Sequence, residues 1–526
     1  MSLTTRAVGS AMWNVGAGLG GRVIGALGTL ILTRYLNPDV VGEVGVASVL
    51  VLTSQVATSA GYGQYVVAHP SAGPVAGFHV TVLSACTVAV VSLLLLVVGQ
   101  PLCHLVNAPG AIAFLPGLVA AFAIQRIAEI PERVLNRELR FRRASLGSGG
   151  AEVVFATVAL GLASQGWGGQ ALVAASLVRA TFRLAIFASG VDPRAWLRWG
   201  PLNRKQVLSI LGFAFPLQLA SLAAFAGARW GTLVVAVMFG PTAMGLYTLA
   251  YNLALIPADN IGEALADVLL PSFARLGPGR RQEALVRAMP LVGLLVFPLA
   301  VGLGVEAHAL VATLFNPRWQ PMAPLVTVLA VMGVVDSMGS ALLAYLKASG
   351  RPRAVLAFNV AHMVVLLFLI ASLGRLGLTW ATLAPGLAGA GYALLALIYV
   401  GRVDGVPVVR ALGGLARVLL ACAGMAAAVL AFRYLHGRDA AHHSIGLLAA
   451  EVAVGAIAYV GTAFVVAPGQ VADLLTSLRR LRESRRPATG GVVEAKPPAG
   501  DADGGGKNVW PIVGGEPGRT PDGADT

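Results

Sequence analysis

The fold of this chain is decided by residues 215–257, FPLQLASLAAFAGARWGTLVVAVMFGPTAMGLYTLAYNLALIP, in which Arg229 is the one charged residue. An apolar run of about 20 residues is long enough to cross the roughly 30 Å hydrocarbon layer of a bilayer as a helix. The stretch holds two such runs, separated by Gly240 and Pro241, and similar runs recur along most of the chain. They predict an all-α polytopic membrane protein.

Composition supports this class. The chain has 526 residues, of which 56% are hydrophobic and 12% are charged, and a water-soluble protein of this length would expose more charge. The strands of a membrane barrel alternate apolar and polar residues, whereas these runs are apolar all round. Cys86, Cys103 and Cys422 are isolated, which excludes a disulfide framework or metal-ligand spacing.

About fourteen spans are expected. They lie near 10–35, 41–65, 78–99, 111–130, 149–166, 169–189, 208–238, 243–270, 286–306, 322–346, 354–373, 377–400, 412–434 and 445–467. The predicted domains are an N-terminal lobe of spans one to six (1–200), a C-terminal lobe of spans seven to twelve (201–405), two extra C-terminal helices (406–470) and a tail (471–526). The tail is first basic and then, after about Pro487, rich in Gly, Pro and Asp, which predicts a disordered cytoplasmic segment.

The cations predict the orientation. Residues 131–145, PERVLNRELRFRRAS, contain five arginines. If the N-terminus is cytoplasmic, this loop and most other Lys- and Arg-rich loops face the cytoplasm, as membrane proteins prefer. Both termini are therefore expected inside, and the cluster is expected to anchor its neighbouring spans and attract anionic lipid headgroups. Because the net charge of +14 lies in short loops, it does not indicate nucleic acid.

An internal duplication is also predicted. The turns YLNPDVVGEVGVAS and MFGPTAMGLYTLAY share Pro-x-x-x-Gly, at Pro38/Gly42 and Pro241/Gly245. Farther on, RELRFRRA, ending at Ala144, resembles KASGRPRA, ending at Ala354, in the same order and at a similar offset. Because each repeat has an even number of helices, six, both copies enter the membrane in the same direction. Transporters built from such parallel repeats bind substrate between the halves near the midplane.

Arginines inside spans are the candidate substrate-binding residues, because intramembrane charges are costly and usually face a cavity or a partner. Under the repeat match, Arg22 and Arg229 lie one turn apart on equivalent helices and share a face. They suit an anionic headgroup such as a diphosphate, or else they pair with a carboxylate of another span. Arg179 is a further cavity candidate. Arg183, one turn on, is expected to pair with Glu152.

Carboxylates inside spans are candidates for coupling or for ion pairs. Asp259 and Glu263 lie one turn apart on one face, and Asp336 lies in another span. They take up H⁺ or Na⁺, pair with cations such as Arg229, or lie at a water-exposed helix end, which is the favoured interpretation for Glu263. The sequence contains no phosphate loop, metal-ligand cluster or nucleophile elbow. No catalytic residue, no metal and no cofactor beyond H⁺ or Na⁺ coupling is therefore assigned, and the chain is not expected to be an enzyme.

The sequence resembles the polysaccharide-transport branch of the multidrug/oligosaccharidyl-lipid/polysaccharide flippase superfamily, which contains the O-antigen and exopolysaccharide repeat-unit flippases. The resemblance runs over residues 5–470 and is carried by LTRYLNPDVVGEVGVAS (32–48), PERVLNRELRFRRAS (131–145), residues 215–257 and VLLPSFARL (268–276). It implies two six-helix lobes around a central, often cationic cavity, with two extra helices. It also implies alternating access that moves a polyprenyl-diphosphate-linked oligosaccharide between leaflets.

The expected function is accordingly export of lipid-linked oligosaccharide repeat units for lipopolysaccharide or exopolysaccharide, in a bacterial inner (cytoplasmic) membrane. The expected partners are the lipid-linked oligosaccharide, membrane lipids, and a polysaccharide polymerase or other biosynthesis proteins, with no nucleic acid. Two alternatives of the same fold stay open: a drug/cation antiporter and a lipid-linked peptidoglycan-precursor flippase. A membrane-embedded polymerase or acyltransferase is disfavoured, because the outer loops are short and His362 has no acidic partner nearby in sequence.

Overall fold

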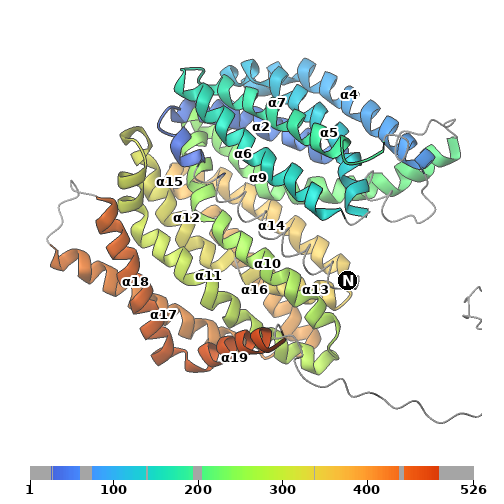
Figure 1. Ribbon diagram of the computed structural model, residues 1–526. Helices are drawn as coiled ribbons and strands as arrows, with labels where there is room; N and C mark the ends of the chain where they lie inside the picture. Colours follow the sequence, from blue (N-terminus) through green and yellow to red (C-terminus); the bar gives the residue numbers. More distant parts are fainter. Residues whose placement is uncertain are drawn as a thin grey trace, which may run out of the picture. The chain divides into compact units, whose positions relative to one another are not determined.

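The computed structural model describes residue 25 and residues 28–59, 74–137, 140–192, 204–336, 338–436 and 444–484. Every regular element in this part of the chain is a helix (Figure 1). Eleven helices there are long and apolar enough to cross a membrane. The predicted all-α membrane class is thus confirmed. The count of fourteen spans and the division into two lobes stay predictions, and most of the first predicted span lies outside the described residues.

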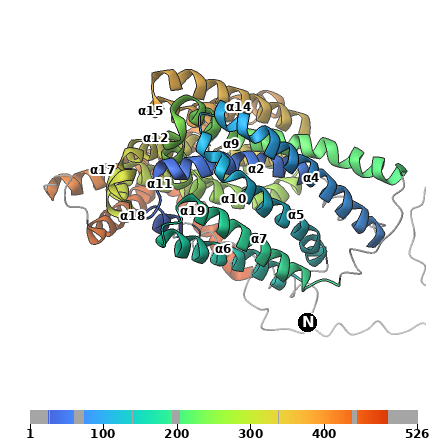
Figure 2. The same cartoon turned by 90° about the horizontal axis from the view of Figure 1, so that it is seen from above.

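The N-terminal part is built from α2 (Pro38–Ser59), α4 (Pro74–Leu105), α5 (Leu115–Arg137), α6 (Phe141–Ser164) and α7 (Gly169–Ala188), with the short helix η1 (Pro109–Ala113) before α5. Helix α2 contacts α4 and α5, while α5 and α6 both pack against α7 (Figure 2). Their shared core is made of small and β-branched residues such as Val46, Ala47 and Val173. Small side chains let membrane helices approach closely.

The central part begins with α9 (Arg204–Ala254), which is kinked at Gly240, and continues with α10 (Ile256–Ala274). Gly240 has φ of 80°, a conformation that glycine adopts without steric cost. This kink coincides with the predicted turn between the seventh and eighth spans. The predicted span 243–270 is, however, divided between α9 and α10, because Pro257 follows the break and cannot donate a helical hydrogen bond.

The remaining helices of this part are α11 (Pro278–Leu314), η2 (Pro317–Met322), α12 (Ala323–Asp336), α13 (Met338–Ala348), α14 (Pro352–Leu373), η3 (Gly374–Leu376), α15 (Leu378–Ala381) and α16 (Ala384–Asp404). The predicted span 322–346 falls on two helices, α12 and α13, with Ser337 between them outside the described residues. One core cluster joins α9, α11, α12 and α14 through residues such as Tyr247, Trp319 and Leu329.

The C-terminal helices are α17 (Val408–Leu435), α18 (Ile445–Val466) and α19 (Pro468–Ser484). Helices α17 and α18 pack on α11. Residues 1–474 form one compact unit, and the chain from Leu475 forms a second, described only to Ser484 at the end of α19. The start of the predicted basic tail is therefore helical, and the predicted disordered segment lies outside the described residues.

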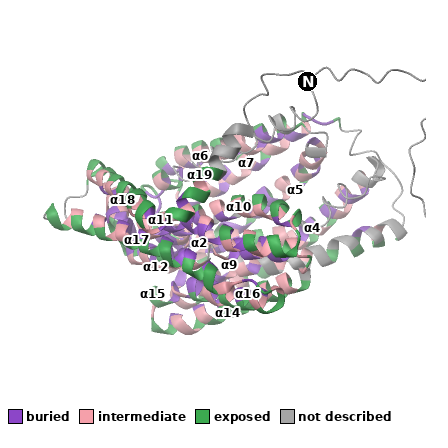
Figure 3. Ribbon diagram, turned by 90° about the horizontal axis from the view of Figure 1, so that it is seen from below, coloured by how far each residue is buried: buried purple, intermediate pink, exposed green. Residues whose placement is uncertain are grey.

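Large apolar side chains lie on the outside of many helices. On α4 these include Val90, Leu93 and Val97, each with at least 65% of its surface exposed. Figure 3 shows exposed residues along α14 and α18 as well. A surface this apolar is stable against acyl chains rather than water, which fits a helix bundle solvated by lipid.

Candidate functional site

The two Pro-x-x-x-Gly motifs predicted as equivalent contact each other directly, where α2 crosses α9. A Cβ on Gly42 would overlap the carbonyl oxygen of Pro241, and a Cβ on Gly245 would overlap the carbonyl oxygen of Pro38. The contact is reciprocal, since each motif presents its proline carbonyl to the glycine of the other. Reciprocal contacts between equivalent residues are what a two-fold relation produces.

Hydrogen bonds from η2 and its preceding residue Asn316, in the central part, surround this crossing. The buried Trp319 donates its indole N–H to the carbonyl of Thr33, at 3.0 Å. Asn316 donates to the carbonyl of Arg34 at 3.1 Å, and Arg318 Nη1 donates to Asn37 Oδ1 at 2.5 Å. Residues 33–42, 240–245 and 316–319 together are called the α2–α9 junction below. It ties the segment that leads into α2 to the central part at one end of the bundle.

A network of charged side chains lies across α5, α6 and α7. Arg126 and Arg133 of α5 both pair with Glu129, the second at 3.4 Å between Nη2 and Oε1. Arg183 of α7 pairs with Glu132 at 3.0 Å, and Arg179 pairs with Glu152 of α6 at 3.6 Å. Among the described residues this network contains four guanidinium groups and three carboxylates. It therefore carries a net positive charge within a largely apolar bundle.

The predicted pairing of Arg183 with Glu152 is wrong. Helices α6 and α7 run antiparallel with Gly150 beside Phe182 and Gly147 beside Phe187, which puts Glu152 level with Arg179. Arg183 lies one turn farther on and reaches Glu132 of α5 instead.

Arg179, predicted as a cavity cation, therefore shares its charge with Glu152. Its guanidinium also lies over the Phe155 ring, 4.7 Å from the centroid. Such stacking on an aromatic face stabilises a cation that has lost water. Arg179 can bind an anion only alongside a carboxylate that already contacts it.

Arg229 lies on α9 facing away from α14. Gly227 and Gly231, which share a face one turn apart, lie against Met363 and Ile370 of α14. Arg229 is two residues from each glycine and thus projects from the opposite side of the helix. It is half-buried and forms no ion pair among the described residues.

The other predicted site residues stay predictions. Arg22 lies outside the described residues. Asp259 and Glu263 lie on α10 and Asp336 ends α12, but the positions of these three side chains are also outside the described part. The described part of the chain contains no group of three or more side chains that could hold a metal ion.

The arginines of the basic loops bind the ends of neighbouring helices. After α5, Arg140 donates to the carbonyl of Gly190 at 2.6 Å and Arg143 to that of Ser189 at 3.1 Å, both just beyond α7. In the matching loop before α14, Arg351 makes two hydrogen bonds to the Asp404 carboxylate at the end of α16. Cations near a helix C-terminus complement its unpaired carbonyls. The cluster thus has a structural role besides the predicted orienting one.

Sequence reasoning missed two features. The first is Arg126, Glu129 and Glu132 on α5, although the spacing of three residues between them was visible. The second is Arg433 of α17, which bonds Glu306 of α11 at 2.5 Å and Glu451 of α18 at 3.3 Å. The two carboxylates are separated by more than 140 residues in sequence, so that no local pattern joins them.

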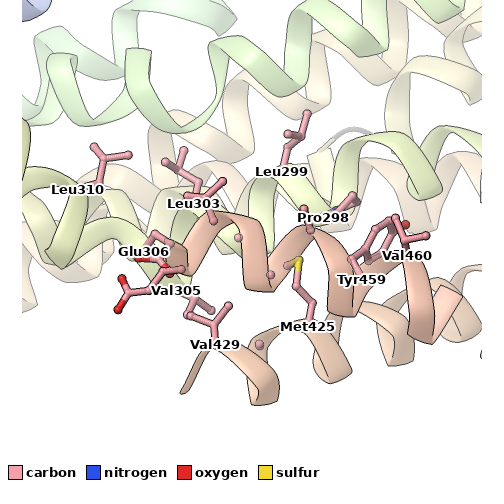
Figure 4. A pocket seen from close by; sticks show the side chains of 16 residues that line it. Pro298, Leu299, Leu303, Val305, Glu306, Leu310, Met425, Val429, Tyr459 and Val460 are labelled. Carbon is pink, nitrogen blue, oxygen red and sulfur yellow. The ribbon is translucent and has the colours of Figure 1, made fainter. Parts of the chain in front are cut away.

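Both of these carboxylates line a cavity of about 390 Å³ between α11, α17 and α18 (Figure 4). Its other walls are apolar and include Leu299, Leu303 and Met425. A second cavity, of about 300 Å³, lies between α4 and α5 and includes Arg126.

Comparison with known proteins now fixes the family. Residues 31–324 match the model of a family described as polysaccharide biosynthesis protein. The chain belongs to the polysaccharide biosynthesis protein family. It is 25% identical over 441 residues to the succinoglycan biosynthesis transport protein ExoT of Rhizobium meliloti (strain 1021), covering 82% of this chain and 87% of the relative. It is 29% identical over 152 residues to the lipopolysaccharide biosynthesis protein WzxC of Escherichia coli (strain K12), covering 28% and 31% of the two chains.

Two solved structures are similar in fold to this chain. The lipid II flippase MurJ in an inward closed conformation superposes with a TM-score of 0.72 at 12% identity, covering 88% of this chain and all of MurJ. An inward-facing multidrug resistance MATE family transporter superposes with a TM-score of 0.60 at 16% identity, covering 73% and 94%. The predicted polysaccharide family is thus confirmed by the family match, and these structures show that the chain shares their fold.

Proposed function

We propose that this protein is a flippase for polyprenyl-diphosphate-linked oligosaccharide repeat units in surface polysaccharide biosynthesis. One observation carries the proposal. Arg229 is a cation inside an apolar helix, and its side chain forms no ion pair among the described residues. Charges in membrane helices persist where they serve a pathway or a ligand. The family match and the printed name of the transport relative support export of a glycan unit.

The chemistry of the cargo explains why cations are needed. Each sugar hydroxyl left without a partner in hydrocarbon costs about 2–7 kcal/mol, so the headgroup needs a polar path. The polyprenyl tail stays in the bilayer. Arg22, Arg229 and Arg179 would bind the diphosphate between the two halves, with Arg179 sharing its charge with Glu152. A carrier of cationic drugs would favour carboxylates at these positions.

Alternating access requires a barrier at one end that can open. The α2–α9 junction supplies one, because backbone packing at Gly42 and Gly245 leaves no space for a side chain. Besides this packing, hydrogen bonds from Asn316, Arg318 and Trp319 hold the junction and would have to break when it opens. With both termini in the cytoplasm, this junction lies on the outer side of the inner membrane and closes an inward-facing state.

The energy for transport would come from an ion gradient or from the gradient of the cargo itself. Asp259, Glu263 and Asp336 are the proposed sites of H⁺ or Na⁺ coupling. A polysaccharide polymerase on the outer face is the proposed consumer of the product.

Reconstitution tests the proposal. Proteoliposomes that contain the full chain and a fluorescent polyprenyl-diphosphate oligosaccharide should expose the label to an external quencher or enzyme. Arg229→Gln should slow this movement at least tenfold, since a charge-assisted hydrogen bond is typically worth about 1.5–3 kcal/mol. The matched control Arg353→Gln removes an exposed cation from α14 and should leave the rate unchanged.

Three results contradict the proposal. One is an unchanged rate in correctly folded Arg229→Gln. The others are movement of a lipid-linked peptidoglycan precursor, or of a cationic dye, in place of the oligosaccharide. Those two cargoes represent the alternative functions of the same fold.

A further inference from the structure

We infer that the cavity between α4 and α5 binds an anionic phospholipid of the surrounding bilayer, with its phosphate on Arg126. This cavity, the α4–α5 groove, has a volume of about 300 Å³. Its polar lining residues are Thr81, Ser84, Ser92 and Arg126, and the rest of its wall is apolar. The bound lipid is distinct from the cargo proposed above, so that the inference stands or falls separately.

The groove is long and narrow. Helices α4 and α5 run antiparallel on either side of η1, with Gly99 beside Leu115 near their connection. Its lining residues on α4 extend from Thr81 to Leu96, which is about 22 Å at 1.5 Å per residue. Counted from the Gly99–Leu115 contact, this antiparallel arrangement puts Arg126 opposite Val88, about one turn from both Ser84 and Ser92, and leaves the Leu96 end to apolar residues.

Two polar side chains of the groove, Arg126 and Ser92, have unused hydrogen-bonding capacity in the described part of the chain. Arg126 is 7% exposed, and although it pairs with Glu129, its Nε has no hydrogen-bond partner in the described part of the chain. The Ser92 hydroxyl, about two turns from Ser84 along α4, is also buried and has no hydrogen-bond partner in the described part of the chain. Buried donors without partners are rare because they cost free energy. A phosphate beside Arg126 would accept from that guanidinium.

The surroundings identify a lipid as the occupant. The groove offers three hydroxyl groups, too few for an oligosaccharide, while its apolar length suits one acyl chain. Ala89, Ala120 and Ile127 of its lining are exposed on the apolar outside of the bundle, where a lipid can enter sideways. With the predicted orientation, Arg126 lies near the cytoplasmic interface, just before the basic loop 131–145. Anionic lipids are abundant in that leaflet.

Native mass spectrometry of the full-length protein in detergent tests the inference. The probes are phosphatidylglycerol and phosphatidylcholine with identical acyl chains. Wild type should retain phosphatidylglycerol about tenfold more strongly, and Arg126→Gln should abolish this preference. Arg375→Gln is the matched control, because Arg375 is an exposed cation on η3, outside the basic loop 131–145, and does not line the groove. Its preference should stay as in wild type.

A second variant keeps the test sharp if Arg126→Gln folds poorly. Ala120→Phe fills the apolar part of the groove and leaves Arg126 in place. It should also reduce phosphatidylglycerol retention about tenfold. Unchanged retention in either folded variant, or equal binding of the two phospholipids by wild type, would overturn the inference. Displacement of phosphatidylglycerol by equimolar polyprenyl phosphate would overturn it too, by assigning the groove to the cargo lipid.

Discussion

At the scale of single residues, the glycines of the α2–α9 junction carry the strictest requirement. Gly42 and Gly245 each face a backbone carbonyl of the opposite motif, and a backbone cannot rotate away as a side chain can. The Pro-x-x-x-Gly pairs were visible in the sequence as an internal repeat. The direct contact between the two motifs was not visible there. A repeat predicts that the motifs occupy equivalent positions but gives no distance between them.

The first prediction concerns these glycines. Gly42→Ala should lower the stability of the folded protein by about 1–3 kcal/mol, because the added methyl forces α2 and α9 apart. The measurement is the thermal unfolding midpoint of the purified protein in detergent. Gly45→Ala, one turn away, meets only the flexible end of Met244 and should leave the midpoint nearly unchanged. Equal effects of the two substitutions would refute the close crossing.

At the scale of helices, ion pairs join elements that are remote in sequence. Arg433 links α17 to both α11 and α18, with Glu451 fully buried and Glu306 nearly so. Neither Arg433 nor the two carboxylates could be assigned a role from the sequence. Sequence reasoning also misassigned the partner of Arg183, because a choice between Glu132 and Glu152 depends on the antiparallel register of α6 and α7.

A charge-removal series tests this link. Arg433→Met should destabilise the protein by about 3–5 kcal/mol, since it leaves two buried carboxylates without their guanidinium. Adding Glu306→Gln and Glu451→Gln should restore most of the loss, because no net charge then remains buried. The measurement is again thermal unfolding in detergent. A triple variant as unstable as Arg433→Met would show that packing, rather than charge, holds α17 and α18 to α11.

The basic loops offer a second test at this scale. Arg351 and Asp404 form a two-bond ion pair between the loop before α14 and the end of α16. Arg351→Asp should lower the yield of folded protein in the membrane, and adding Asp404→Arg should restore part of it by reversing the pair. Yields measured by fluorescence size-exclusion chromatography decide the point, and no recovery in the double variant would count against the pair.

At the scale of the whole molecule, the length and the recurrence of the apolar runs were enough to predict the helical membrane class. The breaks inside the predicted spans 243–270 and 322–346 were harder to predict. Membrane helices tolerate proline and glycine, so these residues do not show where a helix ends. Arg229 was predicted correctly as a charge within α9, since a lone cation in an apolar run is visible in the sequence. Its role in binding stays a prediction.

The central claim is that the bundle carries its anionic cargo by opening and closing at the α2–α9 junction. It is tested most directly by joining Asn37→Cys to Arg318→Cys with a short, cleavable thiol crosslinker, after Cys86, Cys103 and Cys422 have been replaced by alanine. The measurement is the rate at which proteoliposomes expose a fluorescent polyprenyl-diphosphate oligosaccharide. We expect transport before crosslinking, an arrest of at least about tenfold in the crosslinked protein, and recovery on cleavage. Transport at the full rate with the junction locked, or none in the unlocked and folded protein, would contradict it.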